Sequence, residues 1–471
     1  MASWILTSLS TKLLFSISFG LLLSGPGSVV SAFDNTCNSN TAVYWGQNSY
    51  GATHTDKNNF QKTLSYYCQD NSIDVIPISF LNTFFGTGGV PGINLANICN
   101  ADDNSTFPGT GLANCQALAT DIAFCQSKGK ILTISLGGAT GGSFFSSDAQ
   151  ARTFADQVWN LFLGGSSSTR PFGSAVLDGV DLDIESGTGA GYVAFVQQLR
   201  THFTGASKKY YVTAAPQCPY PDAALGAALN GANFDAVYVQ FYNNACGLNT
   251  YPTASTWNFG TWDIWARTVS INKNVKIYIG APASSTAAGS GYQPIANLQN
   301  IAKTMRTNFP SFGGVMLWDA SQAYVNNRYE KAIKDTLTSG GSCGQAFKYP
   351  ACTAPAWSAT GNYPAGSQVT YNGYIWQAKW YASGAPNGLV ESNTWSAISA
   401  CSGTPTGTTT SSPTSTPGTG CAGVAAWSSS TVYASPGTKV SYNGRLWSNK
   451  WWTQGDVPGG SADVWADQGA C

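Results

Sequence analysis

Short apolar runs alternate with helix-length segments along residues 38–338. The runs are rich in β-branched and aromatic residues, which is typical of buried strands. Eight segments have this pattern: Thr41–Gly46, Ile73–Leu81, Lys130–Leu136, Ala175–Glu185, Tyr210–Ala215, Ala236–Tyr242, Val275–Gly280 and Gly314–Trp318. Strands separated by helices pair in parallel through right-handed crossovers, so eight of them predict an α/β fold, a closed (β/α)8 TIM barrel.

A second pattern begins after Leu337, where Gly, Ser, Pro and Trp become frequent and two segments resemble each other. Residues 352–401 contain VTYNGYIW at 369–376, and residues 421–471 contain VSYNGRLW at 440–447. Asn-Gly marks a hairpin turn in each copy, and each copy begins and ends with Cys. We therefore predict two small all-β modules after a barrel domain at 33–345. Residues 402–420 are almost wholly Ser, Thr, Gly and Pro, which indicates a flexible linker.

The N-terminus has the pattern of a secretion signal. Lys12 precedes an apolar stretch, Leu13–Leu23, that is too short to span a bilayer, and Val30-Ser31-Ala32 fits a cleavage site. We read residues 1–32 as a removed signal peptide. No later segment has eighteen consecutive apolar residues, so we expect a secreted protein without membrane association.

Composition narrows the range of partners. The formal net charge is +0 and only 10% of residues are charged, so nucleic-acid binding has little electrostatic support. Abundant Trp, Tyr, Asn and Ser suit a neutral, hydroxyl-rich ligand. The chain has 12 Cys but only 2 His, and no C-x-x-C pair, which indicates disulfides and neither a metal site nor a cofactor. We expect a monomer.

Three carboxylates recur at every second residue of the fourth predicted strand, at Asp181, Asp183 and Glu185. Because side chains alternate along a strand, all three face one site. A calcium loop is excluded, since Ser186 occupies its glycine position and Tyr192 its last ligand position. A purely structural polar cluster is the other alternative, and the strand-end placement disfavours it.

Such a cluster suits general acid catalysis. Two carboxylates about 4 Å apart repel by up to roughly 4 kcal/mol at an effective dielectric of 20, so one should keep its proton near neutral pH. The G-x-S-x-G pattern at 340–344 is a competing hydrolase motif. It lies in a linker without a preceding strand, and both histidines precede it, so we dismiss it.

The carboxylate strand resembles the signature of glycoside hydrolase family 18, the chitinases, and most of all their plant and fungal class III members. The resemblance continues through further blocks in the expected order: Tyr44–Asn48, Ser135–Gly138, Ala214–Cys218, Gln240–Asn244 and Gly313–Trp318.

The resemblance implies a role for each site residue. Glu185 would protonate the glycosidic oxygen, Asp183 would orient the substrate acetamide, Asp181 would share the proton, and Tyr242 would donate to the acetamide carbonyl. Trp318 would form the floor under the reactive sugar. Further substrate contacts are implied for Tyr44, Gln47, Gly138 and Gln240.

The resemblance also implies three barrel disulfides, Cys68–Cys125, Cys99–Cys115 and Cys218–Cys246, and non-proline cis peptides after Ser79 and Trp318. The repeat pairs Cys352 with Cys401 and Cys421 with Cys471. Elimination leaves Cys37 and Cys343 as a pair that would join the ends of the barrel.

The repeated modules resemble carbohydrate-binding families 5 and 12. Flat aromatic rings suit the apolar faces of pyranose sugars, which makes Trp380, Tyr381, Trp451 and Trp452 the candidate binding residues. Adjacent residues on a regular strand face opposite sides, so one of each pair could instead be core. Trp376, Trp395, Trp447 and Trp465 fit core positions better.

The sequence thus predicts a secreted endochitinase that acts on chitin and N-acetylglucosamine oligomers. Two alternatives stay open: an endo-β-N-acetylglucosaminidase that acts on glycoprotein glycans, and a non-catalytic chitin-binding or inhibitor protein on the same barrel.

Overall fold

The computed structural model describes residues 1, 32–140, 144–341, 343–390, 393–403, 421, 423–429, 431–433, 437–450, 453–460 and 464–470. The elements below all lie in the unit Ala32–Cys471. The predicted signal peptide, apart from its first and last residues, and most of the predicted linker fall outside the described residues.

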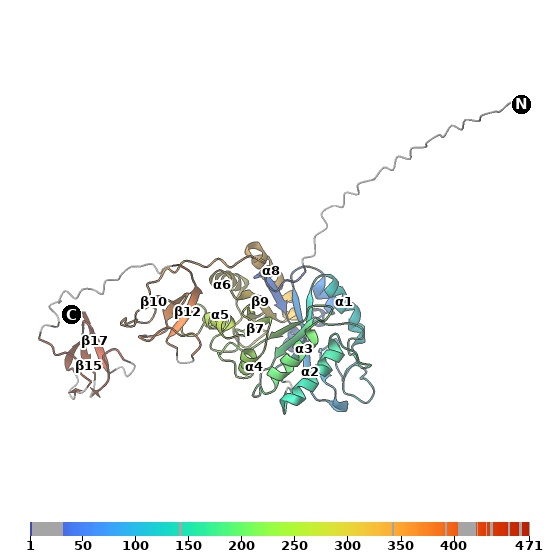
Figure 1. Ribbon diagram of the computed structural model, residues 1–471, viewed down its shortest axis with the longest axis horizontal. Coiled ribbons are helices and arrows are strands. Elements are labelled where there is room, and N and C mark those ends of the chain that lie inside the picture. Colours follow the sequence, from blue (N-terminus) through green and yellow to red (C-terminus); the bar gives the residue numbers. More distant parts are fainter. Residues whose placement is uncertain are drawn as a thin grey trace. The chain divides into compact units, whose positions relative to one another are not determined.

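A closed barrel of parallel strands forms the centre of the first part of the chain (Figure 1). Its strand order is β1-β9-β8-β7-β6-β5-β4-β2, and pairing of β1 with β2 closes the ring. The strands are β1 (Asn40–Val43), β2 (Val75–Thr83), β4 (Ile131–Gly137), β5 (Gly179–Asp183), β6 (Tyr211–Ala214), β7 (Ala236–Gln240), β8 (Lys276–Pro282) and β9 (Phe312–Trp318).

These strands confirm the predicted barrel, with one difference at the strand that carries the acids. The apolar run predicts a strand to Glu185, whereas β5 ends at Asp183, the last residue that pairs with β4. Glu185 therefore lies just beyond the carboxyl end of the strand. The two-residue strand β3 (Gly92–Ile93), antiparallel to β2, is too short for a periodic pattern to predict.

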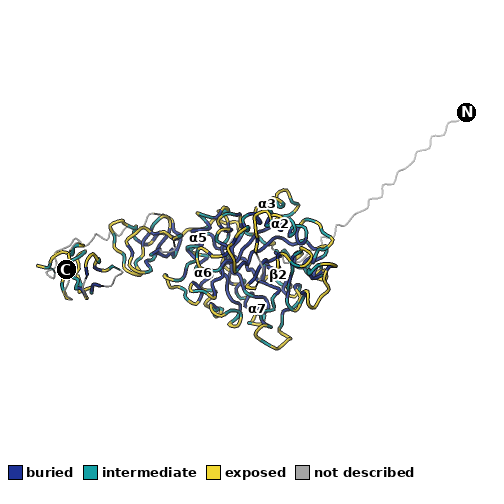
Figure 2. The backbone as a smooth tube through the Cα atoms, turned by 90° about the horizontal axis from the view of Figure 1, so that it is seen from below, coloured by how far each residue is buried: buried dark blue, intermediate teal, exposed yellow. Residues whose placement is uncertain are grey.

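Helices cover the outside of the barrel: α1 (Ala119–Ser127), α2 (Asp148–Phe162), α3 (Tyr192–Phe203), α4 (Gly226–Gly231), α5 (Phe259–Thr268), α6 (Ile295–Asn308), α7 (Ala320–Val325) and α8 (Tyr329–Gly340). Six short 3-10 helices lie in the loops: η1 (Ser49–Ala52), η2 (Lys57–Asn59), η3 (Leu64–Cys68), η4 (Thr87–Gly89), η5 (Gln116–Leu118) and η6 (Leu248–Thr250). The strands are buried, and exposed residues gather in loops and on outer helix faces (Figure 2).

The longest helix, α2, shows how the sequence sets this arrangement. The Ser147 hydroxyl accepts a hydrogen bond from the Gln150 amide and caps its first turn. Phe154, Val158 and Leu161 recur at helical spacing and are buried.

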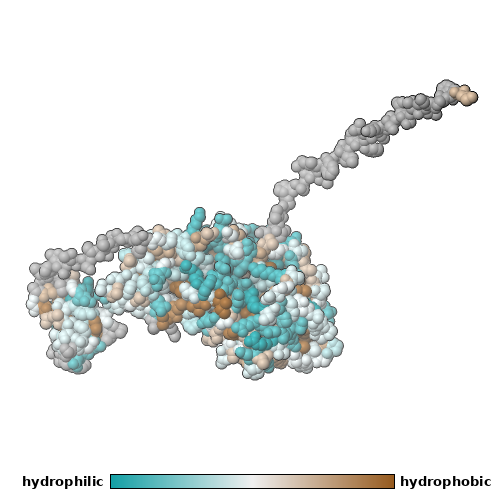
Figure 3. Space-filling model, in the orientation of Figure 1, coloured by the Kyte–Doolittle hydropathy of each residue, from teal (hydrophilic) through white to brown (hydrophobic). Residues whose placement is uncertain are grey.

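Hydrophobic residues form separate patches among hydrophilic ones on the face seen in Figure 3. None of the helices in the described ranges is long and apolar enough to cross a bilayer.

Two small antiparallel sheets follow the barrel and repeat one design. The first contains β10 (Gln368–Tyr371), β11 (Tyr374–Ala378) and β12 (Trp395–Ala400). The second contains β14 (Lys439–Tyr442), β15 (Arg445–Asn449) and β17 (Trp465–Ala470), with a separate pair of β13 (Val432–Tyr433) and β16 (Thr453–Gln454) beside it.

The two sheets also share their register. Val369 pairs with Trp376 in the first and Val440 with Trp447 in the second. The indole nitrogen of Trp376 donates to the Tyr371 carbonyl, as that of Trp447 does to the Tyr442 carbonyl. The fold thus confirms the predicted order of a TIM barrel followed by small β modules.

The described cysteines pair as predicted. The bridges are Cys37–Cys343, Cys68–Cys125, Cys99–Cys115, Cys218–Cys246 and Cys352–Cys401. The predicted Cys421–Cys471 bridge involves Cys471, which lies outside the described residues. Cis peptides at Ser79–Phe80 and Trp318–Asp319 are likewise as predicted.

The disulfide that joins the ends of the barrel should contribute more stability than a local one. Cys37–Cys343 spans 306 residues and Cys99–Cys115 spans 16. A crosslink restricts the unfolded chain more when its loop is longer, so C37S/C343S should lower the free energy of unfolding by roughly 2–3 kcal/mol more than C99S/C115S. Denaturant unfolding of both variants tests this order. An equal or smaller loss in C37S/C343S would contradict it.

Candidate active site

Asp181 lies at the centre of the candidate site and is completely buried. One carboxylate oxygen accepts hydrogen bonds from the hydroxyls of Tyr44 and Ser135, both at 2.7 Å, and the other accepts from Thr213 at 2.6 Å. These donors come from the end of β1, from β4 and from β6. Burial raises the pKa of Asp181, and the three hydrogen bonds oppose that rise.

Asp183 is the next carboxylate on the same face of β5. It is buried, and it accepts a 2.8 Å hydrogen bond from the amide nitrogen of Gln240, which also donates to the Ala215 carbonyl. Burial, with the negative charges of Glu185 and Asp181, holds the pKa of Asp183 well above its usual value. The protonated form of Asp183 is therefore favoured when its neighbours are ionised.

Glu185 is only partly buried, so it can reach both the interior and the space above the barrel. Burial raises the pKa of its carboxyl, and the negative charge of Asp222 raises it further. Asp222 is itself buried, and its carboxylate accepts hydrogen bonds from the backbone amides of Gln217, Ala224 and Leu225. The site thus contains a fixed fourth acid.

Tyr242 closes the side of the site beyond β7. Its ring is buried, and burial, with the charges of Asp183 and Glu185, raises the pKa of its hydroxyl well above the usual value. A phenol in this state remains protonated and can donate a hydrogen bond.

Three aromatic rings lie together at this end of the barrel. The Trp318 ring stacks on Phe80 at a centroid distance of 5.9 Å and contacts Tyr44 at 5.6 Å. Gly138 keeps room for this group, since a Cβ there would lie 2.7 Å from the Phe80 ring. Tyr44 and Phe80 are buried and Trp318 is half-buried, so the Trp318 ring is the part of this group that the face of a sugar can reach.

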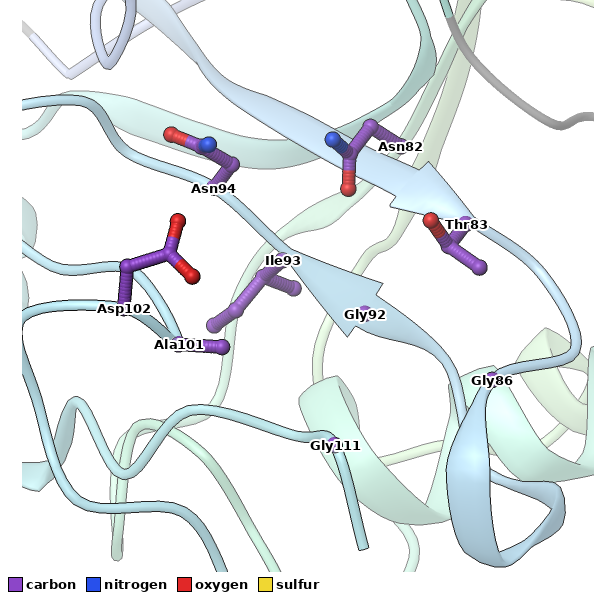
Figure 4. Close-up of a pocket in the computed structure, with 9 residues that line it drawn as sticks. All are labelled: Asn82, Thr83, Gly86, Gly92, Ile93, Asn94, Ala101, Asp102 and Gly111. Atoms are coloured by element: carbon purple, nitrogen blue, oxygen red, sulfur yellow. The ribbon is translucent and has the colours of Figure 1, made fainter.

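The Gln47 side chain links three backbone segments. Its amide nitrogen donates to the backbone carbonyls of Gly46, Ser79 and Asn94. A pocket of about 200 Å³ lies next to this contact, lined by Asn82, Thr83, Gly86, Gly92, Ile93, Asn94, Ala101, Asp102 and Gly111. Figure 4 shows the polar side chains of Asn82, Asn94 and Asp102 around it. Uncharged amides of this kind can bind sugar hydroxyls.

The structure thus brings together Tyr44, Asp181, Asp183, Glu185, Gln240, Tyr242 and Trp318, all predicted from the sequence. Sequence reasoning missed two contributors, Phe80 and Asp222. Phe80 is one residue in an apolar run. Asp222 follows Tyr220-Pro221 in the loop after β6, and a carboxylate at the carboxyl end of a barrel strand was the available signal.

The predicted module aromatics are only partly covered by the described residues. Trp380 and Tyr381 are 49% and 44% exposed just after the end of β11, so neither is a core residue. Trp376, Trp395 and Trp465 are buried, as predicted for core positions, and Trp447 is half-buried. Trp451 and Trp452 lie outside the described residues.

Comparison with known families gives two matches. The family model of glycosyl hydrolases family 18 matches residues 40–304, and that of carbohydrate-binding module family 5/12 matches residues 426–466. The first match covers most of the barrel. The second lies within the second repeat.

Curated relatives match about 70% of the chain. "Chitinase 2" of Rhizopus oligosporus is 48% identical over 332 residues, which are 70% of this chain and 58% of that protein. "Class III chitinase" of Arthroderma benhamiae is 41% identical over 339 residues, 69% of this chain and 94% of that protein. The chain spans 58%, 59% and 52% of the length of the first three relatives it matches.

Solved structures with a similar fold include a chitinase and an inhibitor protein. A chitinase from Ipomoea carnea has a TM-score of 0.52 at 33% identity and covers 63% of this chain and 99% of its own. A xylanase and alpha-amylase inhibitor protein from Scadoxus multiflorus has a TM-score of 0.52 at 32% identity and covers 62% and 97%. The fold alone therefore does not decide between enzyme and inhibitor, and the side chains of the site must.

The fourth acid generates a testable expectation for Glu185. Because the charge of Asp222 raises the pKa of Glu185, D222N should lower that pKa. The chain has three glutamates, Glu185, Glu330 and Glu391, so selective ¹³C labelling gives three carboxyl signals to titrate by NMR, and loss of a signal in E185Q assigns it.

Asp335 provides the matched control, since it is an exposed carboxylate paired with Lys331 on α8. D335N should leave the Glu185 titration unchanged. A Glu185 pKa that stays the same or rises in D222N would show that Asp222 has only a structural role.

Proposed function

The chain belongs to glycosyl hydrolase family 18, and on that premise we propose that it is a secreted endochitinase that cleaves β-1,4 bonds between N-acetylglucosamine units with retention at the anomeric carbon. One observation carries this proposal. Asp181, Asp183 and Glu185 are all present on one face, and Gln240 and Tyr242 are in place beside Asp183.

Glu185 is the general acid. Its raised pKa lets it hold a proton where a leaving group needs one, and its partial exposure lets it reach the glycosidic oxygen. The substrate's own acetamide carbonyl then attacks the anomeric carbon, since enzymes of this family form no covalent bond to a second carboxylate.

Asp183 and Tyr242 position the acetamide for that attack. A protonated or proton-sharing Asp183 accepts from the acetamide N–H as positive charge develops, while the Tyr242 hydroxyl donates to the carbonyl oxygen. Gln240 fixes the Asp183 carboxyl through the 2.8 Å hydrogen bond. Holding a nucleophile within the substrate in this way converts ring closure into a step between pre-aligned groups.

Asp181 regulates the charge of the pair above it. Three hydroxyl donors stabilise its anionic form, and that anion raises the pKa of Asp183. A negative Asp181 thus favours a shared proton on Asp183, which can shift toward Glu185 as the reaction proceeds.

The polymer would bind across the Trp318 ring, which Phe80 and Tyr44 support from within, and continue toward the pocket lined by Asn82 and Asn94. Gly138 supports this surface, and Gln47 could contact a sugar through its free carbonyl side, because its amide nitrogen is used by the backbone.

Two observations favour chitin over the alternatives. A glycan-directed endo-β-N-acetylglucosaminidase would need the same carboxylates but would gain nothing obvious from chitin-type modules, one of which matches the family model at 426–466. An inhibitor on this barrel would not need the acid Glu185 or the acetamide-orienting Asp183, and both are present.

We further propose that the enzyme is of the class III type and carries two chitin-binding modules, at 352–401 and 421–471. The shared register of the two sheets supports the duplication. Five disulfides among the described residues support folding in an oxidising compartment, which agrees with secretion.

Product analysis with a defined chitin hexamer tests the activity. Mass spectrometry should detect internal cleavage to dimer, trimer and tetramer, with the β-anomer formed first. E185Q should lose at least about 99% of the turnover, because general acid catalysis is typically worth 10²- to 10⁴-fold. Intact hexamer with the wild-type protein would point to an inhibitor or lectin, and cleavage of glycoprotein glycans only would point to the glycan hydrolase.

Removal of the second module should separate catalysis from binding. A chain that ends at Gly403 should cleave soluble hexamer at an unchanged rate, but its affinity for insoluble chitin should fall roughly tenfold or more, since a linked second site raises avidity. The full chain with W451A/W452A distinguishes loss of the aromatic platform from loss of the polypeptide. Equal retention of all three proteins on chitin beads would refute the module's role.

A further inference from the structure

The first β module packs directly against a helix of the barrel. Strand β12 contacts α5, and the closest approach is at Gly260, where a Cβ would lie 2.1 Å from the Ala397 carbonyl oxygen. Gly388 of the module fits in the same way between Ile264 of α5 and Trp376 of β11. Ile264, Trp376 and Ala397 are all buried, so this contact excludes water.

A buried carboxylate lies in this contact and takes a partner from each side. Asp263 of α5 is completely buried and accepts hydrogen bonds from the amide and hydroxyl of Ser311 through one oxygen. Its other oxygen accepts a 2.7 Å hydrogen bond from the Tyr374 hydroxyl of the module. Arg267 donates in turn to Tyr374, at 2.6 Å, and to Tyr349. Arg267 also lies 3.7 Å from the Asp263 oxygen that Tyr374 contacts. Separation of the module would remove the Tyr374 donor and leave the carboxylate with this longer ion pair alone at that oxygen, which costs free energy.

The second module has a different surface at the corresponding positions. The registers align Tyr374 with Arg445 and Trp376 with Trp447, and the spacing from Trp395 and Trp465 aligns Ala397 with Asp467. Arg445 and Asp467 form an ion pair whose side chains are 46% and 40% exposed. An anion at the Ala397 position would lie against the Gly260 backbone and oppose docking, whereas a cation at the Tyr374 position would be repelled by Arg267 and attracted by Asp263. The docking face is thus a property of the first module and is replaced by exposed charge in the second.

Docking determines which end of the first module lies nearest the active site. The Ser396 hydroxyl reaches the carbonyl of Trp257, in the connection that leaves the carboxyl end of β7, whereas Tyr374 lies by Arg267 near the far end of α5. Ala378 pairs with Trp395 at the Ser396 end, and the exposed residues Trp380 and Tyr381 follow directly. The two rings therefore project from the end of the module that adjoins the catalytic face.

We propose that the first module is a fixed part of the catalytic unit and holds Trp380 and Tyr381 as an extension of the chitin path beside the catalytic face. The second module, beyond the Ser/Thr/Gly/Pro-rich segment, serves as a separate anchor. The docking itself is independent of substrate, whereas the role of the two rings rests on the proposed chitinase function.

Hydrogen exchange of the full chain tests the docking. Y374R/A397D places the residues of the second module on the first, and the amides of α5 should then exchange roughly tenfold faster or more, as expected when a hydrogen bond to a charged group and its cover are lost. The mirror variant R445Y/D467A is the matched control and should leave α5 unchanged. Unaltered exchange in Y374R/A397D would overturn the docking whatever the enzyme's activity.

A milder substitution guards against a variant that fails to fold. Y374F removes only the hydroxyl that donates to Asp263, and it should raise α5 exchange less than Y374R/A397D does. Exchange of the barrel strands should remain at wild-type levels in both. No effect of Y374F would show that the Tyr374–Asp263 hydrogen bond does not hold the module.

A double-mutant cycle on insoluble chitin tests the role of the rings. W380A/Y381A should lower hydrolysis of insoluble chitin several-fold in the docked protein and cause little further loss in Y374R/A397D, where the rings are no longer held in place. Y374R/A397D alone should cleave soluble hexamer within about twofold of wild type. Additive losses would overturn the positional role of the rings and leave the chitinase proposal intact. If the wild-type chain did not cleave the hexamer, the chitinase proposal would be refuted instead.

Discussion

The buried Asp181 carboxylate is the interaction on which the rest of the site depends. Its hydrogen bonds from Tyr44, Ser135 and Thr213 join β5 to the chain segments of three other barrel strands. A carboxylate without those donors would be too costly to bury, so the side chains that link these strands also stabilise the anion. Burial raises the pKa of Asp183, and the charges of Glu185 and Asp181 raise it further, whereas burial and the charge of Asp222 raise the pKa of Glu185. The strands that form the barrel therefore also supply the donors that stabilise the charge at the centre of the site.

Much of this could be predicted from the sequence because it depends on local periodicity. The eight apolar runs predicted the barrel strands, and the spacing of Asp181, Asp183 and Glu185 predicted a shared face. Local pattern could not place Asp222 or Phe80, since each depends on how a loop or ring from a different strand folds over the site. Both residues contribute because the fold brings them close to the site, and the local pattern of one sequence does not indicate which distant residues become neighbours.

The docking of the first module was equally invisible in the sequence. Tyr374 and Arg445 occupy equivalent places after the same Asn-Gly turn, and although a charged residue favours exposure of the second, the repeat does not indicate what covers the first. The difference arises from α5, more than a hundred residues earlier in the chain, where Asp263 needs a donor and Gly260 leaves room for a backbone. A domain boundary drawn at residue 345 from composition alone therefore divides a packed interface.

The Asp263–Tyr374 contact also limits how such a chain can be rearranged during evolution. Recombination at residue 345 would separate the barrel from its first module. Ile264 and the Asp263 carboxylate would then be uncovered, and a new module would lack the side chains that fit them. Exchange within the Ser/Thr/Gly/Pro-rich segment would uncover neither. The smallest piece that can be inherited intact is thus the barrel together with its first module, while the second module remains free to be lost, duplicated or replaced.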